Sequence, residues 1–437
     1  MAFQKITNKV DEEFLTTKLS SGLTLIMNPK KGFSKTMGIL GVRFGSADNF
    51  LPGEGLLPGQ GRAPLRLPDG TAHFLEHKLF EDEEGDVSDR YAANGAQCNA
   101  STGFNTTSYL FSCTDMVGEN LKLLLSSVQS SYFTEELVRK EQGIIQQEIK
   151  MYEDDPGWIV FFNLLEMLYR EHPARHNIAG TVESISKITP DFLESCYRGF
   201  YRPGNMVLVI SGGFDAEEVY RIAEEDAATR TVDPRGLCSR LFRESDTSPA
   251  GSSKSAEMIV FRPKLLIGFK EADVTATGRE CERIELTTQI ILDALMSKSS
   301  VWHDSAFSRG LIDDTFSAYY SSYGDFGFSL LGADTKDPEG LADRLLAVFK
   351  KAVADGIARD VFERIRNKYV GNYTRMFNSI ESTAYSSMAC FFRGFFPSEI
   401  VDILQEITLD DLNDRLASHF APERMALSVI MPTSEKD

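Results

Sequence analysis

The sequence predicts an α+β protein that contains two homologous domains. The chain has 437 residues, which is too long for one ordinary hydrophobic core and suits two domains of about 200 residues each. A segment of the first half is similar to a segment of the second half, at an offset of half the chain length. Segments typical of strands and of helices are partly segregated, which favours α+β over a doubly wound α/β fold.

The internal repeat is visible at residues 188–208 and 407–427. Without any gap, Ile, Thr, Asp, Leu, Pro, Met and Leu coincide at a constant offset of 219 residues. Each copy predicts a capped helix, a proline-containing turn and an apolar strand. An offset of half the chain indicates two homologous domains and not a solenoid.

Turn-forming residues predict where one domain ends and the next begins. The segments 233–236 and 248–253 are rich in Pro, Gly and Ser and poor in apolar residues. We therefore expect an N-terminal domain at residues 1–230, a linker at 231–256 and a C-terminal domain at 257–437.

The first half predicts both strands and helices. Apolar runs of strand length occupy Gly38–Phe44, Ser108–Cys113 and Met206–Ser211. Helical periodicity predicts helices over residues 71–82, 115–131, 134–152 and 158–170. A Gly- and Pro-rich insertion at residues 48–67 either covers a functional site or, as we prefer, forms a surface loop.

Composition and charge exclude several classes of function. The formal net charge of −18 disfavours nucleic-acid binding, because an acidic surface repels phosphates. No apolar run reaches the ~18 residues that a membrane span needs, and the N-terminal residues lack the apolar core of a signal peptide. The six cysteines are scattered, which is typical of reduced thiols. We therefore expect a cytoplasmic protein with no nucleic-acid partner and no membrane partner.

A candidate metal motif follows the turn at residues 68–71. His73 and His77 are four residues apart, so both side chains lie on one face of the predicted helix. That spacing allows two imidazoles to bind one tetrahedral Zn²⁺. Glu76 lies beside His77, where its carboxylate can reach a metal-bound water. The order His-x-x-Glu-His is the inverzincin motif.

A catalytic zinc needs a third protein ligand. The predicted helix at residues 134–152 and the residue after it supply Glu141, Glu148 and Glu153 as candidates. Glu141 and Glu148 are seven residues apart and share a face that apolar residues flank, so a carboxylate there is costly unless it is paired or metal-bound. The residues alone leave Glu141 and Glu148 as alternatives.

The chain resembles the pitrilysin/insulinase family of zinc metallopeptidases. The matching segments are Ala72–Phe80, Asn99–Thr102, Glu141–Glu148, Ala179–Thr181 and Pro203–Met206. The resemblance implies two homologous α/β-sandwich domains of the metallohydrolase-like type, which form half of a clamshell. It also implies a Zn²⁺ site with Glu148 as the third ligand and Glu141 as a supporting carboxylate of the catalytic site. Because the second half lacks the ligands, we expect one Zn²⁺ per chain.

The resemblance further implies a zinc metalloendopeptidase that cleaves peptides or unfolded polypeptides inside a closed chamber. Zinc activates a water, and Glu76 acts as the general base. Substrate would bind as an added β-strand along the segment Asn99, Ala100, Ser101 and Thr102.

The second half lacks the metal motif. At an offset of 219 residues, the counterparts of His73, Glu76, His77 and Glu148 are Leu292, Leu295, Met296 and Asn367. Among the other histidines, Pro173 disrupts any helix between His172 and His176. His303 and His419 are expected to be structural.

The second half also departs from the family pattern in another way. Many relatives carry an Arg and a Tyr seven residues apart that orient the substrate. The matching stretch here, residues 299–314, is one residue shorter, and its nearby Arg309 has the wrong spacing. The chain is therefore similar to the zinc subunit of bacterial heterodimeric members, in which a paralogous subunit supplies the Arg/Tyr pair. The alternative, a non-catalytic structural or regulatory subunit of the same family, fits the complete metal motif less well.

Overall fold

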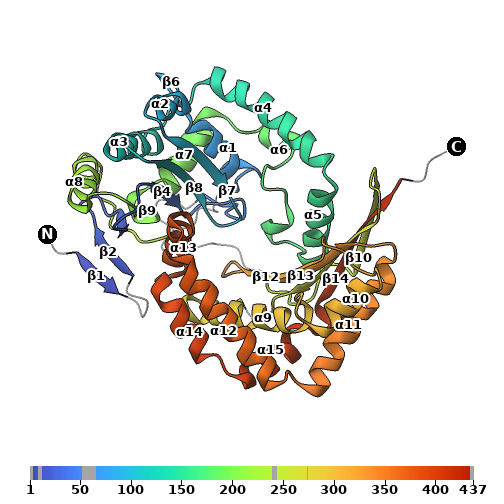
Figure 1. Ribbon diagram of the computed structural model, residues 1–437. Coiled ribbons are helices and arrows are strands. Elements are labelled where there is room, and N and C mark those ends of the chain that lie inside the picture. Colours follow the sequence, from blue (N-terminus) through green and yellow to red (C-terminus); the bar gives the residue numbers. More distant parts are fainter. Residues whose placement is uncertain (1–2, 8–11, 52–64, 239–243, 273, 434–437) are drawn as a thin grey trace. The chain divides into compact units, whose positions relative to one another are not determined.

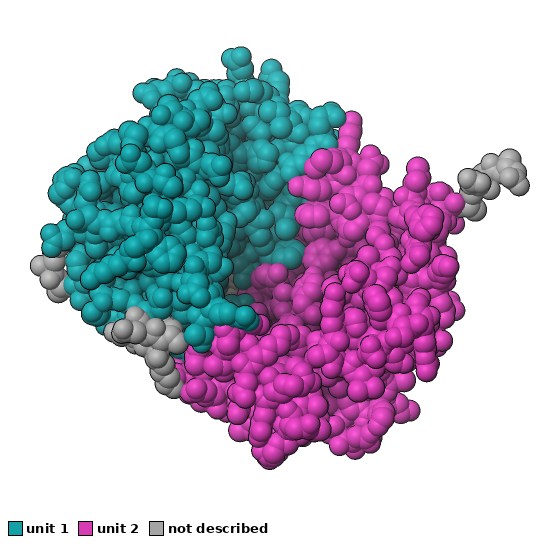
Figure 2. Space-filling view, viewed as in Figure 1, with its two compact units in different colours: residues 1–149, 177–241, 374–399 teal, residues 150–176, 242–373, 400–437 magenta. Residues whose placement is uncertain are grey.

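The computed structural model (Figure 1) describes residues 3–7, 12–51, 65–238, 244–272 and 274–433. The chain forms two compact units, coloured separately in Figure 2. Unit 1 comprises residues 1–149, 177–241 and 374–399, and unit 2 comprises residues 150–176, 242–373 and 400–437. The units are therefore discontinuous along the chain, whereas the sequence predicted two continuous domains.

Unit 1 contains a mixed β-sheet. Within the described residues its strand order is β1-β2-β3-β9-β4-β8-β7. The strands are β1 (Gln4–Thr7), β2 (Glu13–Lys18), β3 (Thr24–Pro29), β4 (Thr36–Val42), β7 (Gln97–Thr102), β8 (Thr107–Cys113) and β9 (Met206–Gly212). Strands β3 and β9 are parallel, and the other neighbouring pairs are antiparallel. Strand β7 lies at one edge of this sheet.

Helices surround the sheet of unit 1. They are α1 (Thr71–Lys78), α2 (Val87–Ala93), α3 (Val117–Val128), most of α4 (Glu135–Glu153), α6 (Val182–Ile185), α7 (Pro190–Phe200), α8 (Ala216–Ala227) and α13 (Ile380–Arg393), and a short ribbon is formed by β5 (Glu81–Asp82) and β6 (Gly85–Asp86). Helix α13 buries Ile380, Ala384 and Met388 at helical spacing, in one core cluster with Ile39 and Val209 of the sheet.

Unit 2 repeats this arrangement around a second sheet. Within the described residues its strand order is β10-β14-β11-β13-β12. The strands are β10 (Ser253–Met258), β11 (Lys264–Lys270), β12 (Ser317–Ser322), β13 (Gly327–Asp334) and β14 (Met425–Pro432). The helices are α5 (Pro156–Leu168), α9 (Gly278–Met296), α10 (Val301–Ser308), α11 (Pro338–Asp355), α12 (Arg359–Met376, mostly in unit 2), α14 (Ile400–Glu406) and α15 (Leu409–His419).

The second sheet repeats the order and direction of strands β3-β9-β4-β8-β7 of the first, as a duplication requires, whereas β1 and β2 have no counterpart in it within the described residues. Strands β10 and β14 are parallel, like β3 and β9, and the remaining pairs of the second sheet are antiparallel. In both copies of the repeat a threonine caps a helix that leads through a proline turn into a strand. Thr189 Oγ1 accepts from Phe192 N at 3.3 Å, and Thr408 Oγ1 accepts from Asp411 N at 3.2 Å. The predicted pattern of helix, turn and strand is confirmed, as is the α+β class.

Two helices explain why the compact units differ from the continuous halves of the sequence. Helix α5 comes from the first half but packs on β10, β11 and β14, and α13 comes from the second half but packs on β4 and β9. Glycines at equivalent register positions make room for them, since Gly41 pairs with Val207 and Gly268 pairs with Ala426. A Cβ at Gly41 would lie 2.6 Å from Met388, and one at Gly268 would lie 2.9 Å from Leu168.

Smaller differences from the sequence predictions are local. The helix expected over residues 71–82 ends at Lys78, because the chain turns there and enters β5. The ends of the insertion at residues 48–67 pair through Leu51 N and Leu65 O at 2.8 Å, while residues 52–64 lie outside the described residues. In the described part of the chain, no helix combines the length and the apolar character that a membrane crossing requires.

Candidate metal centre

Two glycines fix the start of α1, the helix that carries the His-x-x-Glu-His motif. Gly70 caps the helix with a φ of 90°, and Gly180 adopts a φ of 77° beside it. A Cβ at Gly180 would lie only 2.4 Å from Asp69 O, so glycine is needed for this close approach. Ser184 Oγ donates to the same carbonyl at 2.7 Å. The backbone contacts of residues 69 and 180 therefore set the position of α1.

A buried ion pair fixes the other end of α1. The Lys78 side chain is completely buried, and its Nζ donates to Glu81 Oε2 at 2.8 Å. Lys140 of α4 donates to Glu81 Oε1 at 3.0 Å. The hydrogen bond from Lys78 is the largest cause that lowers the pKa of Glu81. Glu81 therefore bridges the end of α1 to α4, the two helices that supply the predicted metal ligands.

The structure brings His73, His77 and Glu148 together, with one candidate ligand atom from each within 4.8 Å of the others. His73 Nε2 lies 3.6 Å from Glu148 Oε1, and His77 Nε2 lies 3.6 Å from Glu148 Oε2. These distances exceed those of good hydrogen bonds. They are close to the separation of about 3.4 Å between ligand atoms that each lie about 2.0–2.1 Å from one tetrahedral Zn²⁺. The three side chains therefore fit a shared divalent cation.

The protonation of His73 also suits a metal ligand. Burial and, second, the neighbouring His77 lower the pKa of His73 to about 4. The ring is therefore neutral at neutral pH, as an imidazole ligand must be. His73 Nδ1 is buried and makes no hydrogen bond within the described residues.

Glu141 contacts the outer nitrogen of His77 and lies outside the three-ligand group. His77 Nδ1 donates to Glu141 Oε1 at 2.9 Å, and the Glu141 side chain is only 8% exposed. This bond selects the tautomer whose Nε2 lone pair points toward Glu148. Burial disfavours the charged His77 ring, but the hydrogen bond to Glu141 and the surrounding carboxylates raise its pKa. Glu141 and Glu148, which the residues alone left as alternatives, therefore approach different ring nitrogens of the two histidines.

Glu76 lies beside the candidate metal ligands and is held by strand β7. Thr102 Oγ1 donates to Glu76 Oε2 at 2.5 Å. Burial raises the pKa of Glu76 above its ordinary value. Sequence reasoning placed Thr102 only in the substrate strand and missed this contact, because residues 76 and 102 have no periodic relation that could have indicated it.

Strand β7, which carries the predicted substrate segment, pairs with β8 on one side and has no other strand partner within the described residues. Asn99 and Ser101 are exposed, whereas Ala100 and Thr102 are partly buried. The Asn99 side chain accepts from Ala100 N at 2.9 Å, a bond that an added strand would have to replace. Ser101 Oγ lies 3.0 Å from Ser108 Oγ on β8.

The second half brings together no comparable set of ligands in the described residues. Leu292 and Met296, the counterparts of His73 and His77, are both buried on α9. His172 lies 3.4 Å from Asp325 and joins no group with metal-binding geometry among the described residues.

The chain is similar to known peptidases. Residues 67–182 match the family Insulinase (Peptidase family M16), and residues 187–369 match the Peptidase M16 inactive domain. The chain is 37% identical to the uncharacterized zinc protease YmfH of Bacillus subtilis over 426 residues, which are 98% of each protein. The crystal structure of a putative M16-like peptidase from Alicyclobacillus acidocaldarius matches with a TM-score of 0.91 at 36% identity, over 99% of each chain. The periplasmic protease PqqL from Escherichia coli shares the fold, with a TM-score of 0.73 at 15% identity over 98% of this chain and 48% of that chain. The chain therefore belongs to the insulinase family of peptidases, peptidase family M16.

Proposed function

We propose that this chain is a zinc metalloendopeptidase that hydrolyses peptides or unfolded polypeptides. The observation that carries the proposal is the convergence of His73, His77 and Glu148, with the carboxylate of Glu76 beside them. Structural zinc sites have four protein ligands, whereas catalytic sites keep three and one open position. The group contains three ligand residues within the described part of the chain, which favours catalysis.

Zinc, when bound, would polarise the scissile carbonyl and make a water more acidic. Glu76 accepts the proton of that water and later delivers it to the leaving amine. The Thr102 hydroxyl holds Oε2 of Glu76, and Oε1 makes no hydrogen bond with the described residues, so Oε1 remains for the proton. Glu141 acts through His77, whose ring it orients, and is therefore a positioning residue.

The peptide substrate binds as an added strand along β7. Asn99, Ala100, Ser101 and Thr102 offer backbone groups at the open edge of the sheet, and backbone pairing makes little demand on substrate sequence. The same strand holds Glu76 through Thr102. A peptide paired with β7 would therefore lie beside the general base.

A paralogous subunit completes the active enzyme in this proposal. It supplies the Arg/Tyr pair that residues 299–314 lack and closes the peptide chamber, and the complex works in the cytoplasm. The chain spans 48% of PqqL, so a single chain of that protein has room for two segments of this size. Co-purification with the tagged chain from its native cell should recover a related chain without the metal motif. Full turnover by the purified chain alone would contradict this part of the proposal.

The peptidase proposal is tested by Glu76→Gln, with the exposed Glu83→Gln as a matched control. Wild type and both variants should bind one zinc each by elemental analysis. Cleavage of a mixed peptide library with the partner present should fall at least ~100-fold in Glu76→Gln only, and a chelator should abolish it in wild type. Undiminished cleavage by Glu76→Gln would overturn the assigned role, and a zinc-free wild-type chain would favour a non-catalytic subunit.

A further inference from the structure

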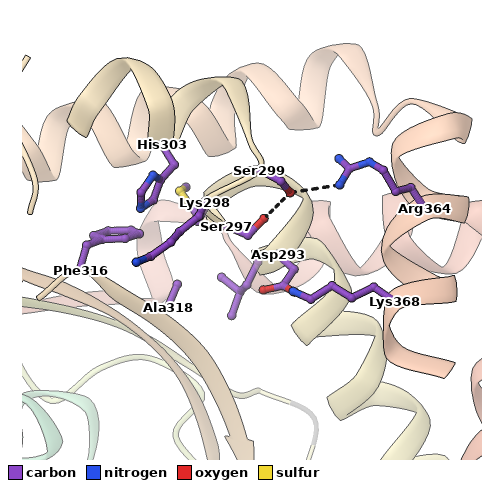
Figure 3. A pocket seen from close by; sticks show the side chains of 11 residues that line it. Asp293, Ser297, Lys298, Ser299, His303, Phe316, Ala318, Arg364 and Lys368 are labelled. Atoms are coloured by element: carbon purple, nitrogen blue, oxygen red, sulfur yellow. Dashed lines mark hydrogen bonds and ion pairs between the residues drawn. The ribbon is translucent and has the colours of Figure 1, made fainter. Parts of the chain in front are cut away.

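Unit 2 contains a cavity of about 600 Å³. It lies between α9, the loop after it, α10, α12 and the start of β12 (Figure 3). Cavities of roughly 300–1,000 Å³ are typical of small-ligand sites. The family resemblance and the peptidase proposal assign no role to this cavity.

The cavity occupies the position in the second repeat that the metal centre occupies in the first. Leu292 and Met296 line it, and they are the counterparts of His73 and His77. Helix α12 and strand β12 also correspond to α4 and β7 in the repeat. The second repeat thus has a cavity at this position, lined by side chains that differ from those of the candidate metal centre.

The lining of the cavity is cationic although the whole chain is acidic. Lys298, Arg364 and Lys368 line it together with one carboxylate, that of Asp293. Lys368 Nζ donates to Asp293 Oδ2 at 2.5 Å, so that pair is largely neutral. Lys298 reaches Asp314 at 3.1 Å, but both side chains are about 80% exposed and such pairs are weak.

Besides Lys298, the exposed side chain of Arg364 is available to a ligand. Its Nη1 donates to Ser299 Oγ at 3.0 Å, and no carboxylate of the described residues lies within ion-pair distance of it. Ser297 Oγ lies 3.2 Å from Ser299 Oγ, as Figure 3 shows, which places two hydroxyls beside the guanidinium.

A buried histidine adds a second unpaired polar group. His303 is 7% exposed and lines the cavity, and its ring nitrogens make no hydrogen bond with the described residues. The two ring nitrogens are accessible, so they can bond a ligand in the cavity. Phe316, Leu292 and Met296 form apolar parts of the wall.

We propose that this cavity binds a carboxylate-bearing ligand with an apolar body. A guanidinium forms two parallel hydrogen bonds with a carboxylate, and the serine hydroxyls and His303 provide further polar contacts. The apolar wall receives the body of the ligand. Two sources share this chemistry, the C-terminal residue of a peptide and a free amphipathic carboxylic acid. A divalent cation does not fit, because the cationic side chains repel it.

The proposal is tested by calorimetric titration of the full zinc-loaded chain with N-acetyl-leucine, octanoate, N-acetyl-leucine amide and inorganic phosphate. Saturable binding of N-acetyl-leucine or octanoate is expected, with the tighter of the two identifying the source. The amide should bind at least tenfold more weakly than N-acetyl-leucine. Arg364→Met should weaken carboxylate binding at least tenfold, whereas Arg359→Met, an exposed control on the same helix, should change it less than twofold.

Two further variants keep the test informative if Arg364→Met does not fold. Ser299→Ala removes one hydroxyl and should weaken binding several-fold, and Ala318→Phe should block the cavity without altering charge. Binding of acid and amide with equal affinity would overturn the proposal. It would also be overturned by phosphate as the sole ligand, by the absence of saturable binding, or by binding that no lining variant changes.

Discussion

The contact between Glu141 and His77 gives a quantitative prediction for Glu141→Gln. The bond at 2.9 Å joins a buried carboxylate to the ring N–H of His77. A hydrogen bond to a charged partner contributes about 1.5–3 kcal/mol and a neutral one about 1 kcal/mol. Since glutamine can still accept the bond, the expected loss is the difference, about 0.5–2 kcal/mol. Zinc affinity should therefore fall by about 2- to 30-fold, because 1.4 kcal/mol corresponds to a factor of ten.

Zinc affinity can be measured by competition with a fluorescent chelator of known affinity. Glu136→Gln on the same helix is exposed and should bind zinc like wild type. Glu148→Gln removes a ligand and should weaken binding far more than Glu141→Gln. If Glu141→Gln bound zinc as tightly as wild type, the contact with His77 would not support the metal site. If it weakened zinc binding as much as Glu148→Gln, the separation of positioning residue from ligand would be wrong.

Three other predictions concern stability. Burial alone would raise the pKa of Glu271, but His419 and Arg415 hold it at about 2 instead of 4.5. This carboxylate should therefore contribute roughly 3 kcal/mol to the free energy of unfolding above pH 4.5, and the contribution should be lost as the pH falls toward 2. The free energy of unfolding of unit 2, measured in urea with the whole chain at pH 6 and pH 3, checks this prediction, and equal values at the two pH values would contradict it. Glu81→Gln should lower the free energy of unfolding by about 2 kcal/mol, because the buried Lys78 loses its charged partner. The loss should be smaller than the roughly 3–5 kcal/mol of a fully buried pair, because Glu81 is partly exposed. An unchanged urea midpoint would refute this prediction. Gly180→Ala should lower the free energy of unfolding by about 1–3 kcal/mol and also weaken zinc binding, because the new Cβ displaces the start of α1. A variant with wild-type stability and wild-type zinc affinity would show that Gly180 does not position α1.

The sequence predicts those parts of the fold that local signals determine. Thr189 and Thr408 are caps with their own hydrogen-bond partners nearby, so both copies of the repeat are visible without tertiary information. The placement of α5 and α13 is different. An apolar helix face predicts burial but does not indicate which sheet it covers, and Gly41 and Gly268 become informative only once the register of the strands is known.

In the candidate site, too, the sequence predicts what local spacing determines and not what tertiary packing determines. His73, Glu76 and His77 lie within one helical turn, so their common location is a property of the helix itself. Glu141 and Glu148 are two turns apart on one face, so periodicity alone does not tell which of them is the third metal ligand. What distinguishes them is which ring nitrogens each carboxylate approaches, and this depends on how α1 and α4 pack. Neither the contact of Glu141 with His77 Nδ1 nor that of Thr102 with Glu76 has a signature along the chain.

The candidate metal centre and the cavity of unit 2 carry different side chains at equivalent positions of the repeat, and this difference favours ions of opposite charge. In unit 1 the imidazoles of His73 and His77 and the carboxylate of Glu148 offer lone pairs and negative charge to a cation. In unit 2 the corresponding helix presents Leu292 and Met296, and Arg364 and Lys368 project from α12 into the lining (Figure 3). Replacing the two histidines by Leu292 and Met296 would by itself give a cavity with no preference for ions of either charge. Arg364, which has no carboxylate partner among the described residues, makes the cavity unfavourable for a cation and favourable for an anion.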